Sequence, residues 1–252
     1  EEGSYTTNTG GMNGVGASCV NALSSRFEMS IRTAGKKYEA VLEKGLIVTP
    51  IHEVEDADTT GTSITFEFDD EIWGDETLDL NKVKKRMRQL AFLNPGLNIY
   101  VIYDTVDHNG NEVKSEDHFC YPEGLKAYVE QLTKTKKLIS SIAVQSKMVD
   151  DVSVSVAYAY TDSFSQEIYT FVNNVATENG GDHLTGFTMG IAKAMERYAL
   201  ESKSIKTAAD ISSEDTREGL VAIVSIKVNE PHFEGQGKSK SKMSKVRTAV
   251  RQ

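Results

Sequence analysis

The chain has 252 residues, with 28 lysines and arginines against 37 aspartates and glutamates, a formal net charge of −9 and 39% hydrophobic residues. This length and apolar content suit one large globular domain or two smaller ones and exclude intrinsic disorder, and no apolar run approaches a membrane span. The acidic total also disfavours a domain that coats nucleic acid by charge alone.

The beginning of the chain lacks the basic flank and apolar block of a signal peptide. The two cysteines, Cys19 and Cys120, form no closely spaced pair of the metal-binding or redox type. Cys19 falls on the apolar face of a predicted helix, where we expect it to pack. These features predict a soluble, cytoplasmic protein without a membrane partner.

The first elements follow a glycine-rich loop over residues 10–16. Apolar residues with helical spacing come directly after it, so we expect the loop to open a helix. Residues 27–31 and 38–42 then alternate between apolar and polar side chains, and the Ala-Gly pair between them predicts a β-hairpin. Residues 64–68 repeat the alternation and predict a further strand.

The middle of the chain combines a predicted helix with a predicted strand. Apolar residues recur at three- and four-residue steps from Leu80 to Leu90, which indicates an amphipathic helix that the Asn-Pro-Gly at 94–96 ends. Residues 97–103 alternate as a strand. The polar stretch 107–117 is predicted to be a turn or an excursion from the core.

The remaining chain begins near residue 122, where we place a domain boundary. The last predicted strand, over residues 220–228, is almost wholly apolar, so we expect it to be covered on both faces. The order strand, strand, helix, strand in this part of the chain implies an α+β or α/β layer with helices against a sheet. The expected elements are a short helix from residue 123, strands over 152–160 and 168–172, a helix carrying residues 184–195, and an apolar strand over 220–228.

Three glycines stand at the entrance of the first predicted helix: Gly11, Gly14 and Gly16. Glycine lets the backbone approach a ligand closely, and the first N–H groups of a helix are unpaired, which suits a phosphate. The loop lacks the Gly-Lys-Ser/Thr of a P-loop, and no strand precedes it as a Rossmann unit requires. A phosphate site and a purely structural turn therefore stand as equal alternatives.

The segment from Lys238 to Gln252 carries six basic residues and no acidic one. Lysines interspersed with glycine and serine suit a mobile loop that approaches a polyanion, where one ammonium group senses a terminal phosphate. Composition alone favours a solvated linker, because blocks of like charge usually face solvent.

Other chemically active residue types give weaker patterns. The five histidines show no metal-ligand spacing, so we expect no protein metal site and assign them to the surface or to local hydrogen bonds. No nucleophile elbow is present. Asp215, Arg217 and Glu218 precede the apolar strand and form either a catalytic cluster or an ion-paired turn, of which we favour the turn.

Ordered blocks throughout the chain resemble the B subunits of bacterial type II DNA topoisomerases, gyrase B and its topoisomerase IV counterpart, which are members of the GHKL ATPase superfamily. The first block is the glycine motif from Gly10 to Ser18 with Asn21 to Ser24. The later blocks cover essentially the rest of the chain: Thr60-Gly61-Thr62, Leu93-Asn94, Glu116-Asp117-His118-Phe119 with Tyr121, Asn173-Asn174, Gly180-Gly181 with His183-Leu184, Arg217-Glu218-Gly219-Leu220, and Gln236 with Lys238.

The resemblance implies an α+β fold. Residues 1–122 would form the C-terminal part of a GHKL ATP-binding α/β sandwich, and residues 123–252 a transducer domain with a mixed sheet backed by helices. The implied function is to couple ATP binding and hydrolysis to DNA strand passage. The implied cofactors are ATP and Mg²⁺, and the implied partners are DNA, a gyrase A-type or topoisomerase IV A-type subunit, and a second copy of the ATPase region.

The resemblance also implies site residues. In the family, backbone amides of the glycine motif surround the triphosphate. Tyr5 resembles the lid tyrosine, and Thr62 resembles the threonine near the adenine. Gln236 and Lys238 resemble the transducer loop that reaches the γ-phosphate, so they are the expected catalytic residues. The positions that match the glycine motif are Gly11, Met12, Asn13, Gly14, Val15 and Gly16.

Three positions depart from the family pattern. Asn13 replaces the usual histidine, Asp182 replaces a threonine, and Gly237 replaces the threonine between the glutamine and the lysine. A glycine there loosens the loop. Lys240 is therefore the substitute for Lys238 if the loop shifts.

The family's general-base glutamate, magnesium-binding asparagine, adenine-reading aspartate and Asp-x-Gly-x-Gly motif lie upstream of the glycine loop, which only nine residues precede here. We therefore expect the magnesium ligand upstream and no ATP hydrolysis by this chain alone. Two alternatives stay open. One is a nonhydrolytic module that binds DNA or a partner, and the other is a GHKL ATPase of the chaperone or mismatch-repair type.

Overall fold

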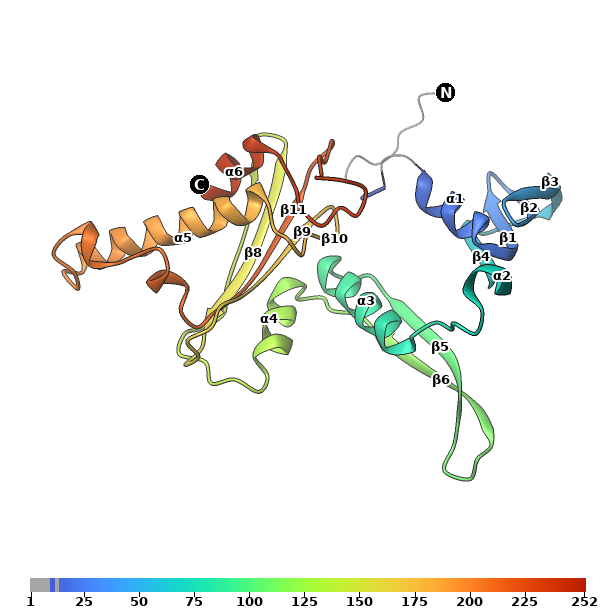
Figure 1. Cartoon of the computed structure of the whole chain (residues 1–252), viewed down its shortest axis with the longest axis horizontal. Coiled ribbons are helices and arrows are strands. Elements are labelled where there is room, and N and C mark those ends of the chain that lie inside the picture. Colours follow the sequence, from blue (N-terminus) through green and yellow to red (C-terminus); the bar gives the residue numbers. More distant parts are fainter. Residues whose placement is uncertain (1–9, 12–13) are drawn as a thin grey trace. The chain divides into compact units, whose positions relative to one another are not determined.

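The computed structural model describes residues 10–11 and 14–252, which divide into two compact units (Figure 1). The small unit is Gly11–Asp79, and the large unit comprises Gly10 together with Leu80–Gln252. No helix in the described parts of the chain is long and apolar enough to cross a membrane.

The small unit contains an antiparallel sheet of order β3-β2-β1-β4. The predicted hairpin is confirmed, and its turn uses positive φ at Ala34 and Gly35 (51° and 78°). The strand β3 was not predicted, because Pro50 interrupts its pattern and most of its side chains are exposed. The elements are α1 (Val15–Ala22), β1 (Ser24–Thr33), β2 (Lys36–Glu43), β3 (Leu46–Asp56), β4 (Gly61–Phe68) and α2 (Asp70–Trp73).

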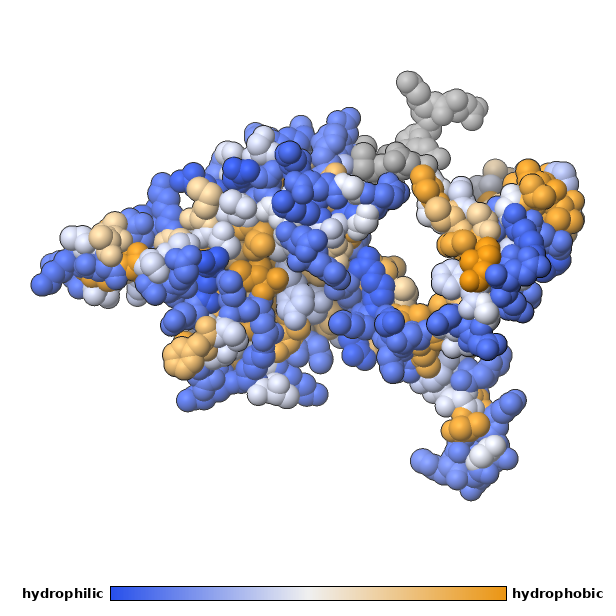
Figure 2. Space-filling model, viewed as in Figure 1, coloured by the Kyte–Doolittle hydropathy of each residue, from blue (hydrophilic) through white to orange (hydrophobic). Residues whose placement is uncertain are grey.

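Apolar side chains remain exposed on the small unit (Figure 2). Leu46 and Ile47 on β3 are 73% and 68% exposed. The glycine loop does open α1 as predicted, but α1 contains no buried residue and Cys19 is exposed. The packing role expected of Cys19 is therefore wrong, because the face of α1 that carries it is not covered.

The large unit is built on a mixed sheet of order β10-β9-β11-β8-β7, in which β11 runs parallel to β9 and antiparallel to β8. Every residue of β11 except Lys227 is buried, which confirms the apolar strand predicted to be covered on both faces. The strands are β7 (Ala143–Val149), β8 (Val152–Tyr160), β9 (Glu167–Val172), β10 (Val175–Ala176) and β11 (Leu220–Lys227).

Helices cover both faces of this sheet (Figure 1). On one face, Leu220 and Val224 of β11 pack against Phe187 of α5, and Ile226 packs against Val246 of α6. Ile223 points to the other face, where it packs with Val129 of α4 and residues of α3. The helices are α3 (Leu80–Leu93), α4 (Leu125–Thr133), α5 (Asp182–Glu201) and α6 (Ser244–Arg251), with short 3₁₀ turns η1 (Ala208–Asp210) and η2 (Asp215–Arg217).

A separate hairpin of β5 (Ile99–Val106) and β6 (Glu112–Phe119) packs against α3. Residues 107–117 were predicted to be a turn or an excursion from the core: residues 107–111 form the turn, and residues 112–117 belong to β6, where none of them is buried. The turn itself spans the residues around Asp107, whose carboxylate accepts hydrogen bonds from the backbone of Asn109 and Asn111. The β6 strand is polar because one face of the hairpin is open to solvent, so it has no long apolar run to reveal it.

Candidate functional site

The loop between β11 and α6 places Lys238 beside the start of the glycine motif. Its Nζ donates a hydrogen bond to the carbonyl oxygen of Gly10 over 2.7 Å. Gly10 lies close against the turn after β9, since an added Cβ would lie 2.5 Å from Val175 Cγ2 and 3.0 Å from the Asn173 oxygen. A side chain at this position would press against Val175 and the Asn173 carbonyl group. Through the Lys238 hydrogen bond, the basic loop and the first residue of the motif meet within the large unit.

Lys240, the substitute candidate, has a different environment. Its Nζ lies 3.2 Å from the Glu234 carboxylate, and its backbone oxygen accepts from Glu234 N–H. Gln236 is exposed between two glycines, and Lys238 itself adopts a positive φ of 53°. The loop geometry therefore directs Lys238 toward Gly10 while Lys240 pairs inside the loop.

The same loop is bonded to the segment that starts α5. Ser239 O accepts a hydrogen bond from Asn179 N–H (2.9 Å), and Ser241 N–H donates to Gly180 O (3.1 Å). At Gly181 the φ is 136°, and an added Cβ would lie 2.2 Å from Ser241 O. The close approach of the backbone at Ser241 explains why residue 181 is a glycine.

His183 lies fully buried behind this loop. Its Nε2 is 2.8 Å from Thr177 Oγ1, and its Nδ1 is 2.8 Å from Ser241 Oγ. Because the Thr177 hydroxyl donates to Thr170 O, we assign Nε2–H as a donor to Thr177 and Nδ1 as the acceptor from Ser241. Burial lowers the pKa of His183 to about 4, so the ring is neutral at pH 7.

Asp182 ties α5 to α6. This carboxylate, which is 8% exposed, accepts hydrogen bonds from Met243 N–H and from the Arg247 guanidinium, whose Nε lies 2.9 Å away. The ion pair fixes the point where the loop enters α6. Sequence reasoning noted Asp182 only as a departure from a threonine, and the pairing with Arg247 carried no local signal.

The predicted residues of the small unit lie around the start of α1 and on β4. Gly14 is the N-cap of α1 with a φ of 64°, and among the described residues no side chain caps the helix and no atom stands within 4 Å of a Cβ added at Gly11 or Gly16. Val15 is 40% exposed, and Thr62 is exposed on β4 opposite Ile31. A helix start with open space beside its backbone fits a phosphate group.

The other predicted site features are outside this geometry. The predicted contacts of Tyr5, Met12 and Asn13 lie outside the described residues. Within residues 10–11 and 14–252, no group of three His, Cys, Asp or Glu side chains is arranged to hold a metal. The turn before β11 contains an Arg217–Glu214 ion pair of 2.9 Å, which agrees with the favoured interpretation of that segment as an ion-paired turn.

Comparison with known proteins places these features in a family context. The family model for DNA gyrase B matches residues 124–252. The DNA gyrase B protein of Clostridium acetobutylicum is 37% identical over 245 residues, which are 96% of this chain and 37% of that protein. The DNA gyrase B protein of Borreliella burgdorferi is 38% identical over 253 residues, 99% of this chain and 39% of that protein. The chain thus spans less than half the length of these relatives.

Solved structures share the fold. The 43K ATPase domain of Thermus thermophilus gyrase B, crystallised with an aminocoumarin, matches with a TM-score of 0.73 and 29% identity over 94% of this chain and 64% of that chain. The topoisomerase IV ATP-binding domain of Francisella tularensis, in complex with a small-molecule inhibitor, matches with a TM-score of 0.77 over 100% of this chain and 66% of that chain. At 24% identity, the second match reports on the fold alone.

Proposed function

The chain belongs to the DNA gyrase B family, and from this premise we propose that it forms part of the ATP-operated region of a type II DNA topoisomerase. In the longer protein, ATP binding and hydrolysis would be coupled to the passage of one DNA duplex through another. The proposed partners of that protein are DNA, an A-type subunit and a second copy of the gyrase B-type chain. The cofactors are ATP and Mg²⁺.

The hydrogen bond from Lys238 to Gly10 is the observation that carries this proposal. It supports a site in which an ammonium group approaches the glycine motif from the loop before α6. A carbonyl oxygen is a neutral acceptor, whereas a terminal phosphate is charged, so the same ammonium would bind the phosphate more strongly. Lys238 then senses whether the third phosphate is present.

The glycine motif supplies the complementary part of the site. Backbone amides of residues 11–16 bind the triphosphate, and the uncapped start of α1 supports this role. Tyr5 covers the nucleotide as a lid residue, Thr62 joins the adenine end through its hydroxyl, and Gln236 accompanies Lys238 at the γ-phosphate. The reaction, phosphoryl transfer to water, relies mainly on positioning and on charge stabilisation.

We place the boundary between a partial GHKL domain (1–122) and a transducer domain (123–252) just before α4. The family match beginning at residue 124 supports this position. Lys238 belongs to the transducer side, so its contact with the γ-phosphate ties the arrangement of the domains to the nucleotide state. The contact disappears on hydrolysis, which lets the domains move.

The test uses a protein extended at its N-terminus to the length of its relatives. We expect Lys238→Ala to weaken binding of a nonhydrolysable triphosphate by roughly 10- to 100-fold, from the loss of one charge-assisted contact, and to leave diphosphate binding unchanged. Lys240→Ala is the matched control and should change neither affinity. If neither variant alters the ratio of the triphosphate and diphosphate affinities, the proposed sensing role is wrong.

The nonhydrolytic binding module makes a different prediction for the same protein. It requires strongly salt-dependent DNA binding without nucleotide. Two cations of the basic segment 238–252 form ion pairs within the chain, Lys240 with Glu234 and Arg247 with Asp182. These ion pairs reduce the positive charge that the segment can offer to DNA. Nucleotide-dependent dimerisation would instead favour the ATP-operated clamp.

A further inference from the structure

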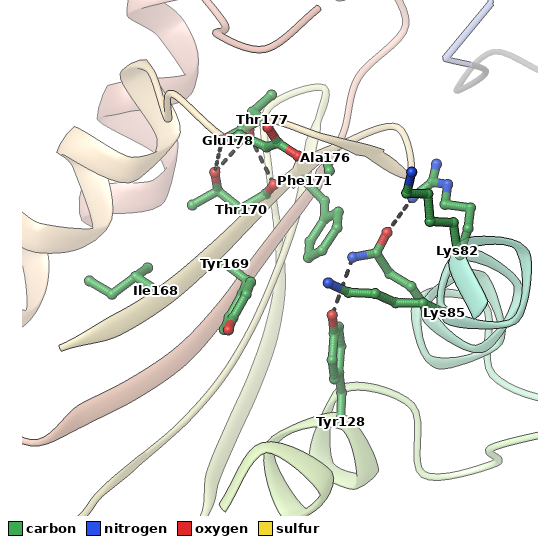
Figure 3. A pocket seen from close by; sticks show the side chains of 12 residues that line it. Lys82, Lys85, Tyr128, Ile168, Tyr169, Thr170, Phe171, Ala176, Thr177 and Glu178 are labelled. Carbon is green, nitrogen blue, oxygen red and sulfur yellow. Dashed lines mark hydrogen bonds between the residues drawn. The ribbon is translucent and has the colours of Figure 1, made fainter. Parts of the chain in front are cut away.

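A cavity lies in the large unit, between α3, α4 and the strands β9 and β10 (Figure 3). Its volume is about 600 Å³, within the range of small-molecule sites. The lining residues that the structure describes include none of the predicted nucleotide-contacting residues. The cavity is therefore a separate feature of the molecule.

One wall of this cavity is basic. Lys85 and Arg86 stand three and four residues after Lys82, so both lie on the face of α3 that carries Lys82. Glu178 is the one carboxylate among the described lining residues, so the wall retains a positive excess in a chain whose net charge is −9. An anionic ligand is the complement of such a wall.

Arg86 is held in place without a carboxylate partner. Its guanidinium donates to Asn174 O over 2.9 Å and to the Gln89 side chain, and no carboxylate of the described residues lies within ion-pair distance of it. Gln89 in turn donates to the Tyr128 hydroxyl over 3.2 Å. Partial burial lowers the pKa of Arg86, which reflects the penalty of a charge removed from water without a counterion.

The opposite wall is aromatic. Tyr169 is 39% exposed on β9, and Phe171 of β9 and Tyr128 of α4, both largely buried, line the cavity beside it; the ring centroids of Tyr169 and Phe171 are each 6.4 Å from that of Tyr128. Figure 3 shows Lys85 reaching from α3 toward Tyr128 and Phe171. A flat apolar ring of a ligand would gain contact with these side chains while its charge meets the basic wall.

We propose that this cavity binds a small planar aromatic anion, with its ring against Tyr169 and Phe171 and its anionic group between Lys85 and Arg86. The chemistry fits an aromatic carboxylate or sulfonate and equally the base and phosphate of a mononucleotide. Lys85 is the residue to alter first, because it is exposed and forms no ion pair among the described residues. Arg86 is a poorer residue to alter, because its guanidinium also donates a hydrogen bond to the backbone oxygen of Asn174.

The experiment titrates the full chain with the fluorescent probe 1-anilinonaphthalene-8-sulfonate and with its neutral analogue N-phenyl-1-naphthylamine. We expect one saturable site for the sulfonate. Lys85→Gln should weaken its binding about tenfold or more, because one charge-assisted contact is lost, and should leave the neutral analogue unchanged. Lys85→Arg should restore the sulfonate affinity, and Lys193→Gln on the exposed part of α5 is the matched control.

Two further measurements locate the site and identify the source of the ligand. Tyr169→Ala should weaken both probes about threefold to tenfold, and the bound sulfonate should slow hydrogen exchange in α3 and β9. Displacement of the probe by AMP would indicate a nucleotide, and displacement by naphthoate alone another aromatic anion. Equal sulfonate binding by the wild type, Lys85→Gln and Tyr169→Ala would overturn the proposal.

Discussion

His183 Nδ1 lies 2.8 Å from Ser241 Oγ, which joins a buried ring at the start of α5 to the loop that carries Lys238. Asn179, Gly180 and Asp182 add backbone and side-chain bonds to the same loop. The position of the loop that carries Lys238 therefore depends on bonds made by residues at the start of α5.

The stability of the protein should depend on pH through His183. Its folded-state pKa of about 4 lies below the ordinary value of 6.5, so below pH 6.5 the unfolded chain binds a proton that the folded chain does not. Stability is then fully present above pH 6.5 and is lost as the pH falls toward 4, by about 2 kcal/mol between pH 7.5 and pH 5.

Urea unfolding of the wild type and of His183→Gln at the two pH values measures this effect. A glutamine keeps hydrogen-bonding capacity toward Thr177 and Ser241 but does not titrate. We expect the variant to lose about 2 kcal/mol less than the wild type on acidification. The same loss in both proteins would show that groups other than His183 are responsible.

Gly181→Ala should destabilise the large unit strongly. The added methyl group would stand 2.2 Å from the Ser241 oxygen, at a φ of 136° that disfavours any side chain. We expect a loss of about 2 to 4 kcal/mol in the free energy of unfolding. Gly237→Ala is the control, since nothing lies within 4 Å of its Cβ, and a similar loss in both variants would contradict the explanation.

Asp182→Ala removes the carboxylate that joins α5 to α6. It leaves Met243 N–H and the Arg247 guanidinium without their acceptor, and we expect a loss of about 2 to 4 kcal/mol in the free energy of unfolding. Asp162→Ala tests an exposed pair with Lys137 at 4.0 Å and should change stability by less than about 0.5 kcal/mol. Calorimetry or urea unfolding distinguishes the two, and equal effects would show that burial of Asp182 is unimportant.

Tyr160→Phe should weaken the turn before β11. The Tyr160 hydroxyl donates to Thr216 O over 2.8 Å, and burial raises the pKa of Tyr160 to about 12. Removing the hydroxyl leaves Thr216 O without this donor, so we expect a loss of about 1 kcal/mol. Tyr198→Phe, at a position 72% exposed, serves as the control in the same unfolding assay. An unchanged midpoint for Tyr160→Phe would show that water replaces the bond.

The elements that could be predicted are those whose burial leaves a local pattern. The β11 strand is an uninterrupted apolar run because both of its faces are covered, and α3 shows the spacing of one buried helical face. The β3 and β6 strands escaped prediction because their side chains are largely exposed, so their sequences do not show which neighbour they pair with.

The candidate site likewise contains features that the sequence could predict and contacts that it could not. The glycine motif and the basic loop are local, and family resemblance identifies them. The bonds of His183 to Ser241 and of Asp182 to Arg247 join residues about sixty positions apart, and no spacing rule connects such pairs. The Gly180-Gly181 pair signals a turn in the sequence, yet the need for Gly181 arises from the Ser241 backbone beside it.

The central place of β11 sets an order of events during synthesis on the ribosome. Its partners β8 and β9 emerge first, and neither can complete its ladder until residues 220–227 arrive between them. Until then the nascent chain holds two apolar strands, β8 and β9, each with an unpaired edge. These are the segments that a chaperone would shield from nascent chains on neighbouring ribosomes.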